Sequence, residues 1–200
     1  MDTDDRLAAD LARDLDRSFD ALVLAHQDRL YTIALRMLGD GRDAEEAAQD
    51  ALVRAYRALA TYDAQRIREL RVRGWLTTIV LNLCRTRGLR RAGRGAPPLS
   101  LDAADAPAAI EPTAPRADAP AEVAERHAER ERWDARLAEL PAAYRAAVVL
   151  RHVDGLSYPD AAAALGRPEG TVKAQVHRGI ALLRAMVEAE TRHELEEMTA

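Results

Sequence analysis

The chain has 200 residues, of which 48% are hydrophobic but only 4% aromatic, and alanine supplies much of the apolar content. Because alanine buries little surface and leads the helix-propensity scale, we expect an all-α fold whose core consists of thin helix–helix contacts and not of thick layers. The net charge is −4, yet residues 64–95 carry nine arginines against Glu69 alone, which predicts an anionic partner at one place.

Several classes of site are excluded by what the sequence lacks. The only cysteine, Cys84, cannot form an internal disulfide, and no cysteine–histidine spacing indicates a metal site. No phosphate-binding glycine loop or nucleophile–base motif is present, so we expect neither catalytic residues nor a cofactor. The acidic N-terminus does not resemble a signal peptide, and no apolar run could span a membrane. We therefore expect a cytoplasmic protein without membrane insertion.

The first helices are predicted from apolar residues at spacings of three and four. An acidic extension, residues 1–17, precedes the first expected domain, residues 18–93. Its first helix is expected to be capped by Ser18 and to end at Gly39, a typical C-terminal cap. The next helix is expected to open at Asp43, which precedes a glutamate by three residues as in a capping box.

This second helix is expected to continue through Ala47, Ala51, Val53, Tyr56 and Leu59. A basic, turn-like stretch follows over residues 61–74. A third helix begins near Trp75, which its spacing places in the core, and ends among arginines up to Arg91.

A change of character marks the middle of the chain. Six prolines between residues 92 and 121 forbid a continuous helix, and the segment has too few large apolar residues to order itself. It predicts a flexible, proline- and alanine-rich linker, residues 94–121, between two small helical domains. The second domain is expected over residues 122–190, followed by a tail, residues 191–200.

The C-terminal domain contains the pattern of a helix-turn-helix. Ser157 and Asp160 form a capping box before a short helix, and Gly166-Arg167-Pro168 separates it from another helix that begins near Glu169. On this last helix four apolar residues share one side, which we expect to face the core: Val172, Val176, Ile180 and Leu183. Small and donor residues occupy the other side, a combination suited to the major groove of DNA.

These motifs resemble the extracytoplasmic-function (ECF) sigma factors of bacterial RNA polymerase. In the C-terminal half the resemblance lies in Leu140-Pro141, Gly155-Leu156-Ser157-Tyr158, Leu165-Gly166 and Gly170-Thr171-Val172-Lys173. In the N-terminal half it lies in Leu38-Gly39-Asp40, Asp43-Ala44-Glu45-Glu46, Gln49-Asp50 and Arg73-Gly74-Trp75-Leu76. Two matches in the family's order, on either side of a proline-rich linker, are more specific than either alone.

The resemblance implies a sigma factor that binds core RNA polymerase and promoter DNA, with an anti-sigma factor as a further partner. It implies that the recognition helix reads the −35 element with Gly170, Thr171, Lys173, Ala174, His177 and Arg178. The −10 element is expected to meet Arg71, Arg73, Asn82, Arg85, Arg87, Arg90 and Arg91. Core polymerase is expected to contact Asp43, Glu46, Gln49, Asp50 and Arg54. Among these residues, we expect Lys173 to touch a phosphate and not a base.

Two other interpretations of the sequence remain open. A helix-turn-helix regulator that acts without polymerase would need only the C-terminal half, and the arginine-rich helix with its tryptophan argues against it. A pure protein-interaction module would use the basic segment only to bind an acidic partner.

Overall fold

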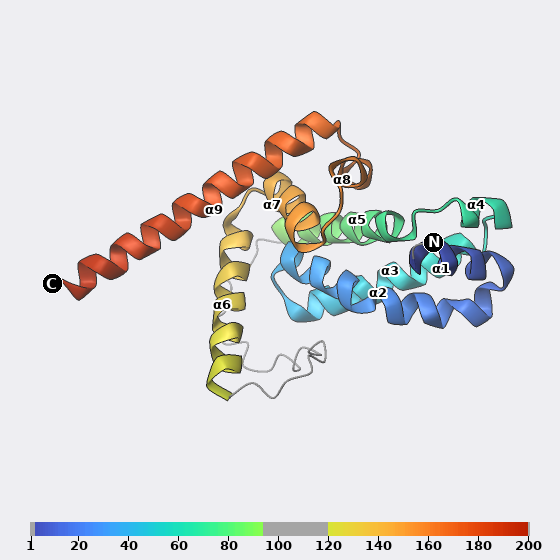
Figure 1. Cartoon of the computed structure of the whole chain (residues 1–200), viewed down its shortest axis with the longest axis horizontal. Coiled ribbons are helices and arrows are strands. Elements are labelled where there is room, and N and C mark those ends of the chain that lie inside the picture. The colour runs from blue at the N-terminus through green and yellow to red at the C-terminus, as the bar shows by residue number, and fades with distance from the viewer. Residues whose placement is uncertain (1–2, 94–119, 200) are drawn as a thin grey trace.

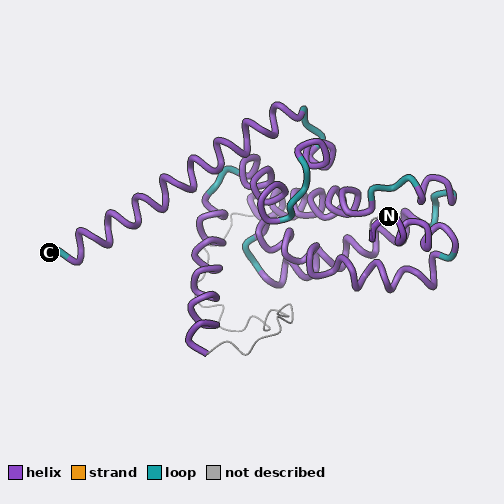
Figure 2. The backbone as a smooth tube through the Cα atoms, viewed as in Figure 1, coloured by secondary structure: helices purple, strands orange, loops and turns teal. Residues whose placement is uncertain are grey.

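A computed structural model (Figure 1) describes residues 3–93 and 120–199. Within these ranges the chain forms helices and loops only, as Figure 2 shows, so the all-α prediction is confirmed. The expected linker, residues 94–121, lies outside the described residues except for its last two positions. In chain order the elements are α1 (Thr3–Arg13), α2 (Leu15–Leu38), α3 (Gly41–Leu59), α4 (Ala64–Arg68), α5 (Val72–Gly93), α6 (Pro120–Glu139), α7 (Ala142–Val148), the π-helical turn η1 (Val149–Val153), α8 (Tyr158–Leu165) and α9 (Glu169–Met198).

Three long helices, α2, α3 and α5, form the body of the N-terminal half (Figure 1). Each of them packs against the other two. The largest fully buried side chains of α2 are Leu22, Leu30 and Ile33, and those of α5 are Val72, Leu76 and Val80. The spacing of three and four residues that predicted these two helices therefore marks their buried faces.

The buried face of α3 consists mainly of alanines. Its buried residues are Ala44, Ala47, Ala48, Ala51, Ala55 and Leu59. Val53 and Tyr56, the larger apolar residues of the expected helix, are 49% and 38% exposed and take no part in this buried face. At about 100° per residue, Val53 lies about 200° around the helix from the buried Ala51. The small side chains allow α3 to approach α2 and α5 closely.

The first two helix caps lie earlier than the sequence suggested. Asp14, not Ser18, caps α2, because its carboxylate accepts a hydrogen bond from the backbone N–H of Arg17 at 3.2 Å. Asp40, not Asp43, caps α3 and accepts from the N–H of Asp43 at 2.8 Å. Each aspartate satisfies an N–H that the helix itself leaves unpaired.

Two further segments are more ordered than expected. The acidic N-terminal extension forms α1, whose Leu7, Ala8 and Leu11 are buried in the core of the first half. The basic stretch after α3 contains the short helix α4, and Ile67 from this helix is also buried. Gly39 ends α2 in the left-handed conformation, with a φ of 71°, as predicted.

The C-terminal half is organised by the crossing of α7 and α9 at Gly179. A Cβ atom at this glycine would lie 2.6 Å from Cγ2 of Val148, so a larger residue would push the helices apart. Beyond the crossing, α9 continues through the expected tail to Met198 and projects away from the remaining helices (Figure 1). No helix of the described ranges combines the length and apolar character needed to cross a membrane.

The two halves lie directly against each other. α5 packs on α8, while α2 contacts α6, α7 and η1. One apolar cluster continues across the boundary, with Leu81 and Cys84 from α5 and Leu150, Ala161 and Leu165 from the C-terminal half. The contact brings the arginine-rich start of α5 beside the helix-turn-helix.

Candidate nucleic-acid and polymerase interfaces

The two ends of α8 fix the geometry of the helix-turn-helix. At its start the Ser157 hydroxyl accepts a hydrogen bond from the backbone N–H of Asp160 at 3.2 Å, as the predicted capping box requires. At its end Gly166 adopts a φ of 61°, a left-handed conformation that costs glycine little. The chain then turns at Pro168 into α9, so the short helix, the turn and the recognition helix follow in the predicted order.

The first four turns of α9 have one buried and one exposed side. Val172, Val176 and Leu183 are at most 5% exposed, and Ile180 is partly buried, so the predicted core face is confirmed. The six residues expected to face DNA are all exposed: Gly170, Thr171, Lys173, Ala174, His177 and Arg178. The helix therefore presents small and donor side chains to the solvent on one continuous face.

Lys173 lies at the edge of this face and has two neighbours. Its ammonium group is 2.7 Å from a carboxylate oxygen of Glu169, and this hydrogen bond raises the pKa of Lys173. It also lies 5.5 Å from the centre of the Tyr158 ring. The lysine remains charged at neutral pH and is directed along the start of α9.

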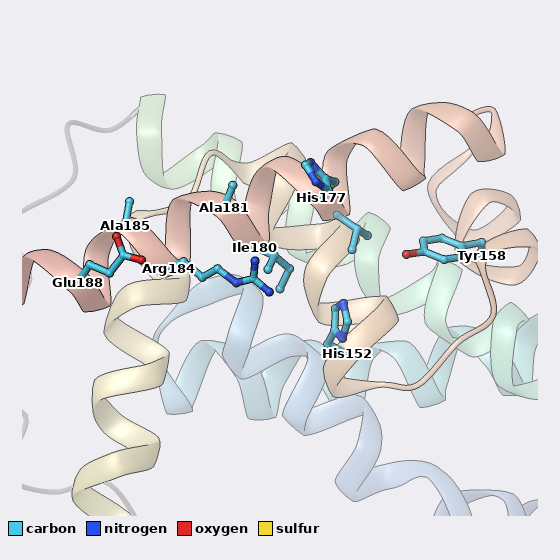
Figure 3. Close-up of a pocket in the computed structure, with 9 residues that line it drawn as sticks. His152, Tyr158, His177, Ile180, Ala181, Arg184, Ala185 and Glu188 are labelled. Carbon is cyan, nitrogen blue, oxygen red and sulfur yellow. The ribbon is translucent and has the colours of Figure 1, made fainter.

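A groove with a volume of about 470 Å³ runs beside the recognition helix (Figure 3). One wall is formed by α9, with His177, Ile180 and Arg184, and the other by His152 and Tyr158. His177 thus lies between the exposed face and this groove, which distinguishes it from the other residues expected to contact DNA.

The arginines at the start of α5 point toward the C-terminal half. Arg71 donates a hydrogen bond to a carboxylate oxygen of Asp160 at 2.5 Å. Arg73 donates to the backbone carbonyl of Asp154 and lies 3.5 Å from a carboxylate oxygen of the same residue. Two residues expected to meet the −10 element are therefore paired with acidic residues from the helix-turn-helix half.

Arg87, further along α5, points toward α3. Its guanidinium group lies 2.9 Å from Glu46 and 2.8 Å from Asp50, and these hydrogen bonds raise the pKa of Arg87. The structure thus joins a residue expected to bind DNA with two residues expected to bind polymerase. The three side chains couple the two helices that would carry these contacts.

Asn82 and Arg85 form the exposed polar face of α5. Both are exposed, and Arg85 donates a hydrogen bond to the Asn82 side-chain oxygen at 3.3 Å. The Asn82 amide group still offers donors on its nitrogen. The last two expected −10 residues, Arg90 and Arg91, belong to the final turns of α5, but their side chains lie outside the described part of the chain.

The outer face of α3 carries the residues expected at the polymerase. Gln49, Asp50 and Arg54 are exposed, and Gln49 donates a hydrogen bond to Glu45 at 3.2 Å. Asp43, in the first turn, is partly buried. Gln49 and Arg54 are exposed to solvent here, while Asp50, at the edge of the face, is also paired with Arg87 of α5.

Comparison with known proteins identifies the family. Models of two protein families match the chain, Sigma-70 region 2 over residues 22–95 and Sigma-70, region 4 over residues 130–183. The ECF RNA polymerase sigma factor SigM of Mycobacterium tuberculosis is 36% identical over 186 residues, which are 90% of this chain and 82% of that protein. The chain belongs to the ECF sigma factors. It therefore directs promoter-specific transcription as a subunit of RNA polymerase, and the prediction from sequence is confirmed.

Other relatives agree with this assignment. The ECF RNA polymerase sigma factor SigE of Mycolicibacterium smegmatis is 34% identical over 167 residues, which cover 84% of this sigma factor but only 60% of SigE. Among solved structures, CnrH in complex with the cytosolic domain of CnrY is 28% identical, with a TM-score of 0.66. The match covers 94% of this chain and 99% of CnrH.

Two features of the sigma factor's surfaces were not found from the sequence. Val53 adds exposed apolar area to the outer face of α3, beside the expected polar contacts, whereas Tyr56 packs edge-on against the Phe19 ring of α2. A helical wheel centred on the alanines of α3 would have placed both outside the core. The pairing of Arg73 with Asp154, 81 residues away, has no local pattern that could indicate it.

Proposed function

We propose that this ECF sigma factor reads the −35 element with the exposed face of α9 and the −10 element with α5, while α3 docks on core polymerase in the cytoplasm. The observation that carries the proposal is the division of α9 into a buried valine- and leucine-rich side and an exposed side of small and donor residues. A helix of this kind can lie deep in the major groove.

The contacts with duplex DNA follow from the exposed residues. Gly170 and Ala174 carry too little side chain to hold the helix away from the base edges. Thr171 and Arg178 supply donors, and arginine binds guanine with two hydrogen bonds. Lys173, beside Glu169 at the start of α9, contacts a phosphate at the edge of the DNA major groove in this proposal.

The −10 contact rests on the exposed side of α5. Single-stranded DNA is bound by cationic grooves, with amides that recognise base edges. Asn82 and Arg85 provide one amide and one cation next to each other. Arg87 supports them indirectly, because its pairing with Glu46 and Asp50 holds α5 against α3.

The polymerase contact rests on the outer face of α3. Val53 is half exposed between Gln49 and Arg54 on this helix, which gives the polar surface an apolar centre. A buried apolar centre with a polar rim is typical of protein interfaces. CnrH, the similar solved structure, is bound by the cytosolic domain of CnrY, and we propose that an anti-sigma factor also binds this chain.

The test uses the recognition helix within the assembled polymerase. Holoenzyme formed with this protein selects duplexes from a random-sequence library, and the selected duplex is then bound by Arg178→Ala holoenzyme. We expect binding about tenfold weaker, since one good contact with a base is worth about 1–3 kcal/mol. The affinity for core polymerase should be unchanged.

The control is Arg192→Ala, which removes an exposed arginine from the same helix beyond the helix-turn-helix. It should leave both affinities unchanged. Equal loss of duplex binding in the two variants, or loss of core affinity with Arg178→Ala, would refute the assignment of the recognition face.

A further inference from the structure

The short helix α4 cannot hold its shape alone. It has five residues, and isolated helices of fewer than about 12 residues are marginal in water. Ile67 is its buried residue, at 5% exposure, whereas Gln65, Arg66 and Arg68 are exposed. The conformation of α4 therefore depends on the element that covers Ile67.

The helix that lies against α4 is α1. It packs on both α4 and α2 (Figure 1) and also touches α5. Its Leu7, Ala8 and Leu11 are at most 8% exposed, and they belong to the same apolar cluster as Ile67 and Val72, the first residue of α5. α1 therefore helps to bury the segment between α3 and α5, residues 60–71, which we call the α3–α5 segment.

Apolar burial, and not charge, attaches α1 to the rest of the domain. Asp4 of α1 lies 3.6 Å from Nε2 of the buried His26. Burial lowers the pKa of His26, so its ring is neutral at neutral pH and this contact is not an ion pair. Leu7 and Leu11 are thus the groups whose loss would release α1.

The α3–α5 segment carries cations beside aromatic rings. The Arg66 guanidinium lies 3.7 Å from the centre of the Tyr62 ring, and this ring lies 6.2 Å from that of Trp75 in the first turn of α5. Arg68 is exposed on α4. Single-stranded nucleic acid is bound by cations and aromatic rings together. Affinity is greater when such groups are already in place, because ordering them during binding costs free energy.

We propose that α1 is a positioning element for the −10 strand: by covering Ile67 it holds the α3–α5 segment in the conformation that receives single-stranded DNA. The inference rests on the proposed function of α5 and adds two residues, Leu7 and Leu11, that act from the protein interior. The match to Sigma-70 region 2 begins at residue 22, so α1 lies outside it. Release of α1 lowers the fraction of molecules with an ordered segment, and the rate of strand opening falls with that fraction.

The test separates duplex binding from strand opening. Holoenzyme carrying Leu11→Ala is mixed with a duplex selected by the wild-type holoenzyme, in which the fluorescent base 2-aminopurine replaces an adenine of the −10 element. The Kd is measured in the cold, where the strands stay paired, and should be unchanged. The rate of opening at saturating holoenzyme, followed by the rise in fluorescence on warming, should be about tenfold lower. Ile67→Ala should have the same effect from the other side of the contact.

Ile33→Ala is the matched control for lost stability. Ile33 is 1% exposed and lies about two turns of α2 beyond His26, so its truncation removes a similar buried volume away from Asp4 and α1. It should lower the urea midpoint as Leu11→Ala does and leave the opening rate unchanged. Leu11→Met, which conserves the side-chain volume, should open the duplex at the wild-type rate.

The order of the α3–α5 segment is read from the fluorescence of Trp75. The chain has two tryptophans, and Trp133→Phe removes the exposed one on α6. In this background iodide should quench Trp75 more strongly with Leu11→Ala or Ile67→Ala than in the parent protein. Ile33→Ala should show the quenching of the parent.

Three results would overturn the inference. The first is a wild-type opening rate in both Leu11→Ala and Ile67→Ala. The second is equal slowing by Ile33→Ala, because α1 would then only stabilise the fold. The third is slow opening with unchanged quenching of Trp75. If Leu11→Ala does not fold, the comparison of Ile67→Ala with Ile33→Ala decides alone.

A further variant distinguishes failure of this inference from failure of the proposed function. Arg85→Ala, on the exposed face of α5, should slow opening whether or not α1 positions the α3–α5 segment. Normal opening with Arg85→Ala would refute the role of α5 itself. Slow opening with Arg85→Ala and normal opening with Leu11→Ala would refute the role of α1 alone.

Discussion

The crossing of α7 and α9 makes Gly179→Ala a sensitive test of the C-terminal packing. The added Cβ would lie 2.6 Å from Cγ2 of Val148 and 3.4 Å from Cβ of Tyr144. An ordinary contact between carbon atoms is about 3.5–4.0 Å, so the methyl group is about 1 Å too close to the valine. Valine in a helix has essentially one side-chain rotamer, so the strain must be relieved by moving the helices.

The expected magnitude follows from two opposed effects. Overpacking of this kind costs about 1–3 kcal/mol, and replacing glycine by alanine inside a helix returns about 1 kcal/mol. Gly88→Ala in α5 provides the control, because it receives the same propensity gain and its Cβ meets nothing within 4 Å. The difference between the two variants therefore isolates the steric cost, about 1–3 kcal/mol.

Urea unfolding followed by circular dichroism measures this difference. Gly179→Ala should unfold at a lower urea concentration than the wild type, and Gly88→Ala at a slightly higher one. If Gly179→Ala were as stable as Gly88→Ala, the close approach of α7 and α9 would be wrong. The position of the recognition face relative to the core would then be wrong as well.

Two further predictions concern titratable groups. Burial raises the pKa of Cys84 to about 12, so very little of its thiol is ionised at pH 8. Iodoacetamide at this pH should therefore alkylate Cys84 at least about 100-fold more slowly in the native protein than in urea. Equal rates would contradict the burial of Cys84. The hydrogen bond from Ser157, and after it the pairing with Arg71, lowers the pKa of Asp160. The ionised Asp160 carboxylate therefore stabilises the fold at any pH above its pKa in the unfolded chain, about 3.9. This stabilisation is lost as the pH falls through the lower pKa of the folded state. The difference in unfolding free energy between the wild type and Asp160→Asn should therefore be constant near neutral pH and shrink below about pH 4; a difference that grew on acidification would contradict the pairing.

The parts of the fold that were predictable depend on local patterns. The core face of α9, the Ser157 capping box and the Gly39 cap each follow from residues within one or two turns of one another. α3 was harder, because a face of alanines contrasts little with its surroundings and the larger Val53 and Tyr56 dominate the pattern. Local periodicity records size and polarity along one helix, and it misleads when small residues form the contact.

The functional residues divide in the same way. The exposure of the α9 face that we propose contacts DNA could be predicted, because this face is the complement of the helix's own core face. The partners of Arg73 and Arg87 could not, because they lie on other helices 81 and up to 41 residues away. Arg29, the centre of the contact between the halves, carries no motif in the sequence, and its partner lies 125 residues away. Only the assembled structure shows which arginines are paired with acids.

Transcription with purified core polymerase tests the central claim most directly. Fragments of bacterial genomic DNA are transcribed with core polymerase alone, with this protein added, and with the protein carrying Arg178→Ala, and the 5′ ends of the transcripts are mapped. We expect a set of start sites that depends on the protein, shares sequence elements near −10 and −35, and is depleted by Arg178→Ala. Start sites that are the same with and without the protein would contradict it.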